Sequence, residues 1–538
     1  MRRMSKTDRR GWFYGQFRTI GNRVAIGLAA AALTAAMFAT PAAFGQQAGG
    51  DNKSAQTPPA ASKPQAETHI TPEQAKELFR SVDELTKFAS EETGLPQKHE
   101  VKRTLTTRVA VEKYLTDKFN EDEDAKRMQR GEIVLKKFGL LDRDFDLKPF
   151  MLSLLKEQIA GYYDSKSKTV YMLDWIDPET QKPVLVHELT HALQDQHTDL
   201  EKWSDQTPPD VSHNVGEDND HLAKDEMDTA RTAALEGQAM AVFLDYSLKP
   251  SGRSIIKNPE LLDQLQDQTA GEDSPVLARA PLLLSESLLF PYKDGLSFEQ
   301  DVWMDKGQKA AFAGVLDRPP ASSWEVMNPR AYEQGKQPPV LSMPDIHRLL
   351  DARYKAYDIG QVGQLDLRIL AQIFGGDGAA RELTPAWDGG IYWAGQLTSA
   401  KTAAEQGSTK SIALMYLSAW KSSASAHTFA RMYADEVGRK YSGVKLDVAD
   451  MPLNDAHGAE TIYTTNEGPV VITTRGKYVF VSESFDLETA RKLTDLLIDG
   501  QGTGEIRTAQ LLEPQTGLSA SLVRFMHSCG MMKAAIVR

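Results

Sequence analysis

The chain has 538 residues, 25% of them charged, with a formal net charge of −12 and one cysteine. An acidic balance of this size argues against nucleic acid or an anionic membrane as a partner. The single Cys529 excludes an intramolecular disulfide and any zinc site built from several thiolates. A tightly bound metal must therefore rely on histidine and carboxylate ligands.

The first 45 residues have the organisation of an export signal. A basic leader precedes an Ala-rich apolar run from 24 to 39, which is too short for a comfortable membrane span. Small residues at Ala43 and Gly45 predict cleavage before Gln46. We expect an exported protein, periplasmic or extracellular, with no stable membrane association after cleavage. The basic residues of the leader are Arg2, Arg3, Lys6, Arg9, Arg10, Arg18 and Arg23.

The leader leaves the export route open. The pair Arg9-Arg10 is compatible with the twin-arginine route as well as the general secretory route, although Asp8 stands where the twin-arginine signal usually has a small hydroxyl residue. The leader carries seven basic side chains and one acidic one, so its removal takes the net charge from −12 to −18. That charge suits a soluble exported protein.

Residues 46–69 are rich in Gln, Ala, Pro, Ser and Gly and predict a flexible linker. Ordered structure is expected from Thr71, where Thr71-Pro72-Glu73-Gln74 combines an N-cap, a proline at the first helical position and a capping box. This helix runs toward Gly94. Apolar periodicity predicts further helices at 107–119, 122–138 and 147–158.

A β-hairpin is predicted directly before the most informative segment of the chain. Residues 159–164 and 169–174 have strand character and flank the polar turn 165–168. An extended peptide could pair with the edge formed by residues 161–164. An ordinary structural hairpin, with its tyrosines packed on the sheet, explains the same pattern equally well.

The segment from 184 to 197 contains His187-Glu188-x-x-His191 on an apolar helical frame. On a helix the two histidines lie one turn apart, so both imidazoles leave the same face and can meet one metal ion. Glu188 then lies where it can take a proton from water beside that ion. The apolar neighbours would bury the helix, and buried imidazoles need partners. The pattern therefore predicts a zinc site with Glu188 as general base.

Two residues compete for the role of third zinc ligand. His197 follows His191 at the spacing of the metzincin pattern, but that pattern needs a glycine where this chain has Gln194. If the helix continues through Gln194, His197 turns about 240° away from His191 and leaves the ligand face. Glu236, within the Ala-rich helical segment 228–240, would otherwise face apolar neighbours at a cost. We therefore predict Glu236 as the third ligand, with His197 as the alternative.

Other histidines are weaker candidates for the same role. His213 and His221 fall in the polar stretch 210–225, which we expect to be a loop. A mobile loop holds ligand geometry poorly.

The motif followed downstream by a helical Glu-Gly resembles the thermolysin-like gluzincins, in which two His and a later Glu bind one zinc ion. The longer string from 187 to 200 looks more closely like a group of exported bacterial proteins treated as metallopeptidases. This resemblance implies His187, His191 and Glu236 as zinc ligands and Glu188 as general base. It covers about residues 150–490 and includes, less specifically, the segments 289–295, 318–323, 360–363 and 389–390.

The chain departs from the gluzincin pattern at one position. Gluzincins often carry an Asp four residues after the ligand Glu to orient a zinc-bound His, and here that position is Met240. Asp195 or Asp228 would have to supply this orientation. The donor that stabilises the oxyanion is equally open, because Tyr162, Tyr292 and His347 cannot be ranked by sequence.

The remaining chain predicts architecture more than chemistry. Proline-punctuated helices between 275 and 355 could line a cleft, and a helix at 365–374 precedes an expected loop at 387–390. Strands are expected at 411–420, 469–474 and 477–482, with helices at 426–433 and 487–498. The predicted fold class is α+β: a zincin-like catalytic domain with helical surroundings and a smaller C-terminal α/β module. The predicted boundaries are 1–45 signal peptide, 46–69 linker, 70–355 catalytic domain, 356–500 C-terminal module and 501–538 tail.

Three functions fit these features. The first is hydrolysis of peptide bonds in a peptide or protein substrate by water that zinc and Glu188 activate. The second is a non-catalytic exported protein that keeps the fold for binding or scaffolding. The third is a zinc amidohydrolase that acts on cell-wall amides. Glu188 favours an enzyme, because a binding role has no use for a carboxylate beside the two histidines.

Overall fold

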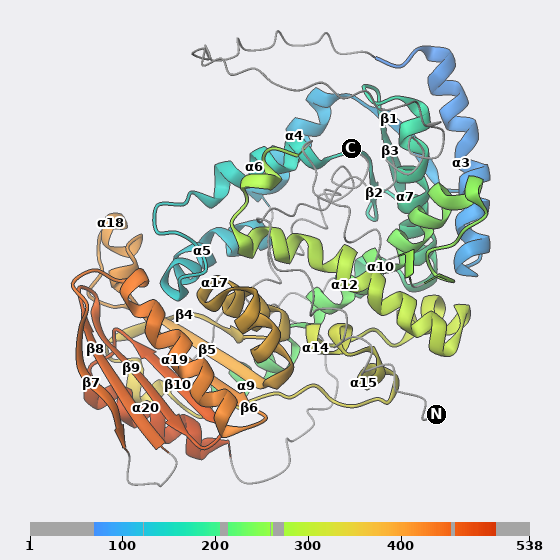
Figure 1. Cartoon of the computed structure of the whole chain (residues 1–538). Coiled ribbons are helices and arrows are strands. Elements are labelled where there is room, and N and C mark those ends of the chain that lie inside the picture. Colours follow the sequence, from blue (N-terminus) through green and yellow to red (C-terminus); the bar gives the residue numbers. More distant parts are fainter. Residues whose placement is uncertain are drawn as a thin grey trace, which may run out of the picture.

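The computed structural model describes residues 69–121, 123–204, 214–258, 260–261, 274–452 and 458–501. The predicted signal peptide, the linker up to residue 68 and the tail beyond residue 501 lie outside these ranges. The described chain is a mixed α and β structure with a helical part and a seven-stranded antiparallel sheet (Figure 1). Within the described ranges, every helix is too short or too polar to cross a lipid bilayer.

The N-terminal helices follow the predicted pattern closely. Helix α3 begins after Thr71, whose side chain and that of Gln74 form the expected capping box, and it ends at Gly94 with a φ of 69°. A positive φ at a helix C-cap suits glycine. The other three predicted helices are also confirmed. The bounds are α3 (Pro72–Thr93), α4 (Arg108–Glu121), α5 (Glu123–Phe138) and α6 (Leu147–Gln158).

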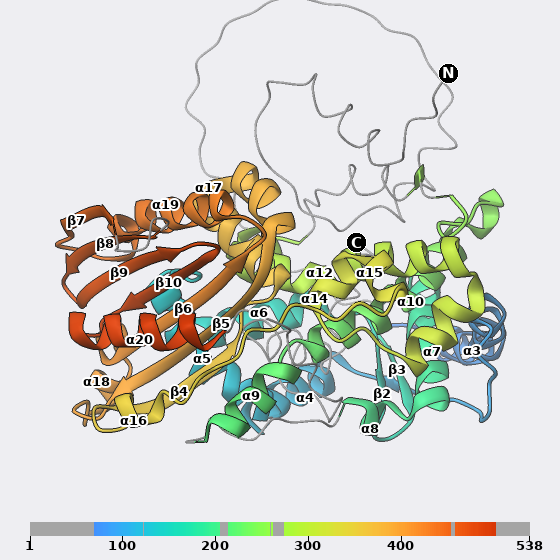
Figure 2. The same ribbon diagram turned by 90° about the horizontal axis from the view of Figure 1, so that it is seen from below.

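A three-stranded sheet precedes the helix that carries the His-Glu-x-x-His motif. It consists of β1 (Lys102–Thr106), β2 (Tyr162–Asp164) and β3 (Thr169–Leu173), in the order β1-β3-β2. Strand β1 pairs with β3 in parallel, and β2 pairs with β3 antiparallel, which confirms the predicted hairpin. β2 is therefore an edge strand. The sheet lies beside α7 (Pro178–Thr198) in both views (Figures 1 and 2).

Two long helices complete the surroundings of α7. They are α10 (Met227–Leu248), which packs against α7, and α12 (Leu282–Lys306), which packs against α10 and extends toward the large sheet (Figure 2). Shorter elements connect them: α8 (Leu200–Ser204), α9 (Val215–Lys224), η2 (Lys249–Ser251), η3 (Leu277–Arg279), η4 (Ala310–Gly314), α13 (Val315–Asp317), α14 (Ser323–Met327), α15 (Pro329–Glu333) and α16 (His347–Leu350). The predicted loop at 210–225 is wrong in part, because residues 215–224 form helix α9. Its N-cap Asn214 and its buried Leu222 stabilise it.

The seven-stranded sheet has the order β4-β5-β6-β10-β9-β8-β7, and all its neighbours are antiparallel. Its strands are β4 (Tyr354–Gln361), β5 (Trp387–Leu397), β6 (Ile412–Trp420), β7 (Lys445–Pro452), β8 (Gly458–Thr465), β9 (Gly468–Arg475) and β10 (Tyr478–Glu483). The predicted strands correspond to β6, β9 and β10. The expected loop at 387–390 is instead the irregular start of β5, where the pairing with β6 shifts register between Trp387 and Gly390.

Helices cover both faces of this sheet. α17 (Gln364–Leu383) and α19 (Ser423–Lys440) lie over one face, and α20 (Leu487–Gly500) lies under the other (Figure 2). Alternate residues of the central strands therefore enter two separate cores. β6 is buried along its whole length, which explains its nearly continuous apolar sequence. The remaining short elements are η5 (Thr384–Ala386), α18 (Ala403–Gln406) and η6 (Thr409–Ser411).

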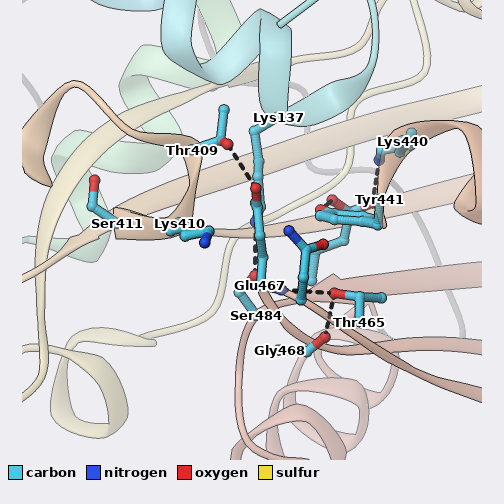
Figure 3. Close-up of polar contacts among 12 residues, drawn as sticks. Lys137, Thr409, Lys410, Ser411, Lys440, Tyr441, Thr465, Glu467, Gly468 and Ser484 are labelled. Carbon is cyan, nitrogen blue, oxygen red and sulfur yellow. Dashed lines mark hydrogen bonds and ion pairs between the residues drawn. The ribbon is translucent and has the colours of Figure 1, made fainter. Parts of the chain in front are cut away.

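A buried charge network joins α5 to the sheet part (Figure 3). The Lys137 ammonium donates to Glu467 Oε2 at 2.9 Å and to Ser484 Oγ at 2.7 Å, and the side chains of Lys137 and Glu467 are 0% and 3% exposed. Arg143 also pairs with Glu467. Burial lowers the pKa of Lys137, although the carboxylates beside it oppose this shift. The loss of one partner from such a pair is costly, because it leaves the other charge buried without compensation.

Candidate metal centre

Helix α7 brings the two motif histidines together. Asp177 caps the helix by accepting from Glu179 N at 2.9 Å, and the helix then continues without interruption to Thr198. Every residue from 184 to 195 is buried. The rings of His187 and His191 are 4.7 Å apart between centroids, and their Nε2 atoms are 3.0 Å apart.

Glu236 of α10 meets both histidines. Its Oε2 lies 3.0 Å from His187 Nε2 and 3.4 Å from His191 Nε2. Two ligand atoms of a tetrahedral zinc site lie about 3.3 Å apart, since each is about 2.05 Å from the ion. The observed donor separations fit such an ion. His187, His191 and Glu236 are 1%, 5% and 2% exposed, and a buried group of this composition fits the His-Glu-x-x-His…Glu zinc pattern.

A close helix crossing places Glu236. A Cβ on Gly237 would lie 2.3 Å from the backbone of Gly295, and a Cβ on Gly295 would lie 2.2 Å from the carbonyl oxygen of Ala233. Backbones of α10 and α12 therefore meet with no room for a side chain. This approach brings Tyr292, almost one turn before Gly295, against Glu236.

Tyr292 contacts the candidate ligands from α12. Its hydroxyl hydrogen-bonds to Glu236, and its ring lies nearly parallel to that of His187 with a centroid distance of 6.3 Å. Burial raises the pKa of Tyr292 well above its usual value, and the nearby charges of Glu236 and Glu188 add to this effect. The phenol is therefore a hydrogen-bond donor to Glu236. Sequence reasoning could not rank this tyrosine, because its role depends on the helix crossing.

Gln194 orients His191. Gln194 Oε1 lies 2.7 Å from His191 Nδ1, and Gln194 Nε2 donates to Leu235 O at 3.0 Å and to Gln238 Oε1 at 2.9 Å. The amide nitrogen is thus committed to acceptors, so the oxygen must face the imidazole. His191 then carries its proton on Nδ1, and its Nε2 lone pair is available to a metal ion.

Gln194 takes the role toward His191 that the sequence offered to Asp195. Asp195 accepts from the hydroxyl of Tyr163, from Lys168 Nζ at 2.9 Å and from Leu200 N at 2.8 Å. It therefore fastens α7 to the β2–β3 hairpin and to α8, and the expectation that it orients a histidine is wrong. Asp228 lies in the first turn of α10, two turns before Glu236.

Glu188 is 0% exposed and lies close enough to Tyr292 to raise the pKa of its hydroxyl. The predicted general base is thus buried beside the three convergent side chains. It follows His187 directly on α7, as the sequence pattern requires.

The alternative histidines lie elsewhere. His197 Nε2 is 2.9 Å from Asp317 Oδ1, and its helix continues past Gln194 as predicted. His221 lies on α9, 3.5 Å from Asp225 Oδ1, and His213 lies outside the described residues. Within the described ranges, His187, His191 and Glu236 form the one group of histidine, cysteine or acidic residues that could hold a metal ion.

In comparisons with known proteins, no family model matches the chain, and no curated protein and no solved structure is significantly similar to it. The chemistry of the site therefore has to be argued from its own geometry.

Proposed function

We propose that the chain is an exported zinc-dependent peptidase of the gluzincin type, with a zincin-like catalytic domain. His187, His191 and Glu236 are the proposed zinc ligands, and Glu188 is the proposed general base. One observation supports this proposal most strongly. The Nε2 atoms of both histidines lie close to one carboxylate oxygen of Glu236, and the buried carboxylate of Glu188 follows the first histidine in the sequence.

A zinc ion in this site would supply a Lewis acid that activates water and polarises an amide carbonyl. Glu188 accepts the proton of the attacking water and returns it to the leaving amine. Gln194 holds the proton of His191 on Nδ1, and Tyr292 orients the carboxylate of Glu236. These groups are arranged before substrate arrives, so they need no reorganisation during the reaction.

The edge strand β2 supports a peptide as the substrate. It is three residues long and lies at the side of its sheet next to α7. An extended peptide can add to such an edge through main-chain hydrogen bonds. Asp195 ties Tyr163 of β2 to α7, which holds the distance between the edge and the histidines.

A non-catalytic metal protein is the second candidate, and the burial of the site favours it. His187, Glu188, His191 and Glu236 are all at most 5% exposed, as expected of a structural site that is closed to solvent. A peptidase with this site must open it to admit substrate. The carboxylate at position 188 separates the two functions, because only hydrolysis requires it.

The test combines metal analysis with hydrolysis of casein by the purified protein. We expect about one zinc ion per chain. Glu188→Gln should retain the zinc and lose about 10²- to 10⁴-fold of the activity, the usual contribution of a general base. Glu91→Gln is the matched control, since Glu91 has a 65% exposed side chain on α3 and should behave as wild type.

Two outcomes would contradict the peptidase. Unchanged hydrolysis in Glu188→Gln would remove the proposed base, and stoichiometric zinc without hydrolysis of casein would favour the scaffold. Isolated cell-wall peptides provide a further substrate in the same assay, because their hydrolysis in place of casein would indicate the amidohydrolase.

A further inference from the structure

Four buried side chains meet in the sheet part, where α19 and β10 both end. Lys440 Nζ is in direct contact with Glu483 Oε1, and the two side chains are 3% and 0% exposed. The hydroxyls of Tyr433 and Tyr441, which are also buried, donate to the carboxyl group of Glu483. An amine and a carboxyl group are therefore held against each other, away from water, between two phenols.

Burial disfavours the charged forms of this pair. It lowers the pKa of Lys440, although the carboxylate of Glu483 opposes the shift. Transfer of one proton from the ammonium to Glu483, across their direct contact, produces a neutral amine and a neutral carboxylic acid. The neutral amine has the lone pair that an attack on the carboxyl carbon requires.

Tyr433 bridges the two reacting groups. Lys440 Nζ donates to the Tyr433 hydroxyl at 2.9 Å, and this hydroxyl donates to Glu483 Oε1 at 2.7 Å. Burial raises the pKa of Tyr433 well above its usual value, and the charge of Glu483 adds to this effect, so the phenol stays neutral. It can take a proton from the nitrogen while it gives its own proton to Oε1.

Tyr441 contacts the other carboxyl oxygen. Its hydroxyl donates to Glu483 Oε2. When an amine attacks a carboxyl carbon, negative charge develops on oxygen, and a donor that is already in place stabilises this charge. The contacts therefore distinguish the two oxygens: Oε1 faces the amine and Tyr433, and Oε2 faces Tyr441.

We propose that Lys440 and Glu483 condense to an intramolecular isopeptide bond, with Tyr433 as the proton relay and Tyr441 as the donor to the oxyanion. The lone pair of Nζ forms the new bond to Cδ of Glu483, and the bond between Cδ and Oε1 breaks. Oε1 leaves as water, with one proton from the carboxylic acid and one from the nitrogen through Tyr433. The step needs no oxidant or other reactant, and it is independent of the metal centre.

The bond would act as a covalent restraint where a disulfide cannot form. The single Cys529 excludes an intramolecular disulfide. A crosslink between positions 440 and 483 closes a loop that contains β7, β8, β9 and most of β10. Such a closure limits the freedom of the unfolded chain. Unlike a disulfide, an amide bond persists under reducing conditions.

The neighbouring pair Lys137 and Glu467 should stay an ion pair. Glu467 contacts two cations, Lys137 and Arg143. Burial alone would raise the pKa of Glu467, but these cations hold it below its usual value, so the group stays ionised. A carboxylate is a poor electrophile. This pair is therefore an internal control for the effect of burial alone.

Peptide mass spectrometry of the purified protein tests the proposal. Trypsin does not cleave after an acylated lysine, so the bond produces one branched peptide that joins residues 440–445 to residues 478–491. Its mass is the sum of these two peptides minus one water molecule. Without the bond, residues 441–445 and 478–491 appear as separate peptides. The peptides that contain Lys137 and Glu467 should be separate in the same digest.

Three variants test the roles of the side chains, with the branched peptide followed over time after cell-free synthesis. Lys440→Arg should abolish it. Tyr433→Phe removes the relay and keeps the ring, and it should slow formation by about 10²-fold or more, the usual contribution of an acid–base group. Tyr441→Phe removes the oxyanion donor and should slow formation by about 10²-fold.

Tyr332→Phe is the matched control. Tyr332 is also a buried tyrosine, and its hydroxyl donates to Arg318 O at 2.6 Å in the helical part. Its loss should lower the melting temperature and leave the branched peptide unchanged. A wild-type digest that contains only the separate peptides would overturn the proposal. Formation at the wild-type rate in Tyr433→Phe would also overturn it.

Discussion

Glu226 is the clearest electrostatic probe of the joint between the helical part and the sheet part. It lies at the N-cap of α10, is 4% exposed, and accepts a hydrogen bond from the Ser323 hydroxyl. Burial, together with the nearby carboxylates of Asp366 on α17 and of neighbouring Asp225, raises its pKa to about 8. A Cβ on Gly363 would lie 1.7 Å from Glu226 Oε1, so the sheet part approaches this carboxyl closely.

The stability of the protein should therefore fall as the pH rises from 4.5 to about 8. Below pH 4.5 both the folded and the unfolded states hold the Glu226 proton, so this group has no effect. Between these two pKa values only the folded state keeps the Glu226 proton, so each pH unit lowers the free energy of unfolding by about 1.4 kcal/mol. The total reaches about 5 kcal/mol at pH 8 and stays constant above it.

Glu226→Gln should remove this dependence, because the amide stays neutral and still accepts from Ser323. Urea denaturation of wild type and variant at pH 5 and pH 8.5 measures the effect. The variant should gain about 4 kcal/mol relative to wild type between the two pH values, because part of the effect is already present at pH 5. A difference that stays constant with pH would refute the reasoning, and Glu91→Gln, which changes an exposed carboxyl, should show no such change.

Three further substitutions test the metal centre and the buried charge network between α5 and the sheet part. Gly295→Ala forces a methyl group against the backbone of α10 and should lower stability by about 3 kcal/mol or more, as measured by thermal denaturation. Gly131→Ala is the control and should not lower stability, because a Cβ at Gly131 would meet no atom within 4 Å. Tyr292→Phe removes the hydrogen bond to the carboxylate ligand of α10 and should weaken zinc binding by about 10- to 100-fold in chelator competition. Lys137→Met leaves Glu467 buried without its ammonium and should cost about 3–5 kcal/mol, and the double variant with Glu467→Gln should recover part of that loss.

Local sequence signals predicted the parts of the site that depend on one helix. The capping box at Thr71 correctly placed the start of α3, and helical spacing correctly set His187 and His191 on one face. Because position 194 is Gln where the metzincin pattern has Gly, the sequence correctly indicated that α7 continues and that His197 leaves the ligand face. Glu236 was found by a different argument, the cost of burying a carboxylate without a partner, and the structure brings it to the two histidines.

Contacts between distant segments could not be predicted from the sequence. Gln194 orients His191 only because residues more than 40 positions away accept from its amide nitrogen. Tyr292 meets Glu236 because the backbones of α10 and α12 are in close contact, and the apolar periodicity of the two segments does not predict this contact. Helix α9 was mistaken for a loop because its polar residues outweigh one buried leucine.

The ligand assignment is the central claim, and equilibrium zinc binding tests it most directly. The measurement compares wild type with Glu236→Ala and with His197→Ala, which removes the competing histidine. We predict about one zinc ion per chain in wild type and in His197→Ala, and none retained by Glu236→Ala after dialysis. Full zinc occupancy in Glu236→Ala together with metal loss in His197→Ala would contradict the assignment.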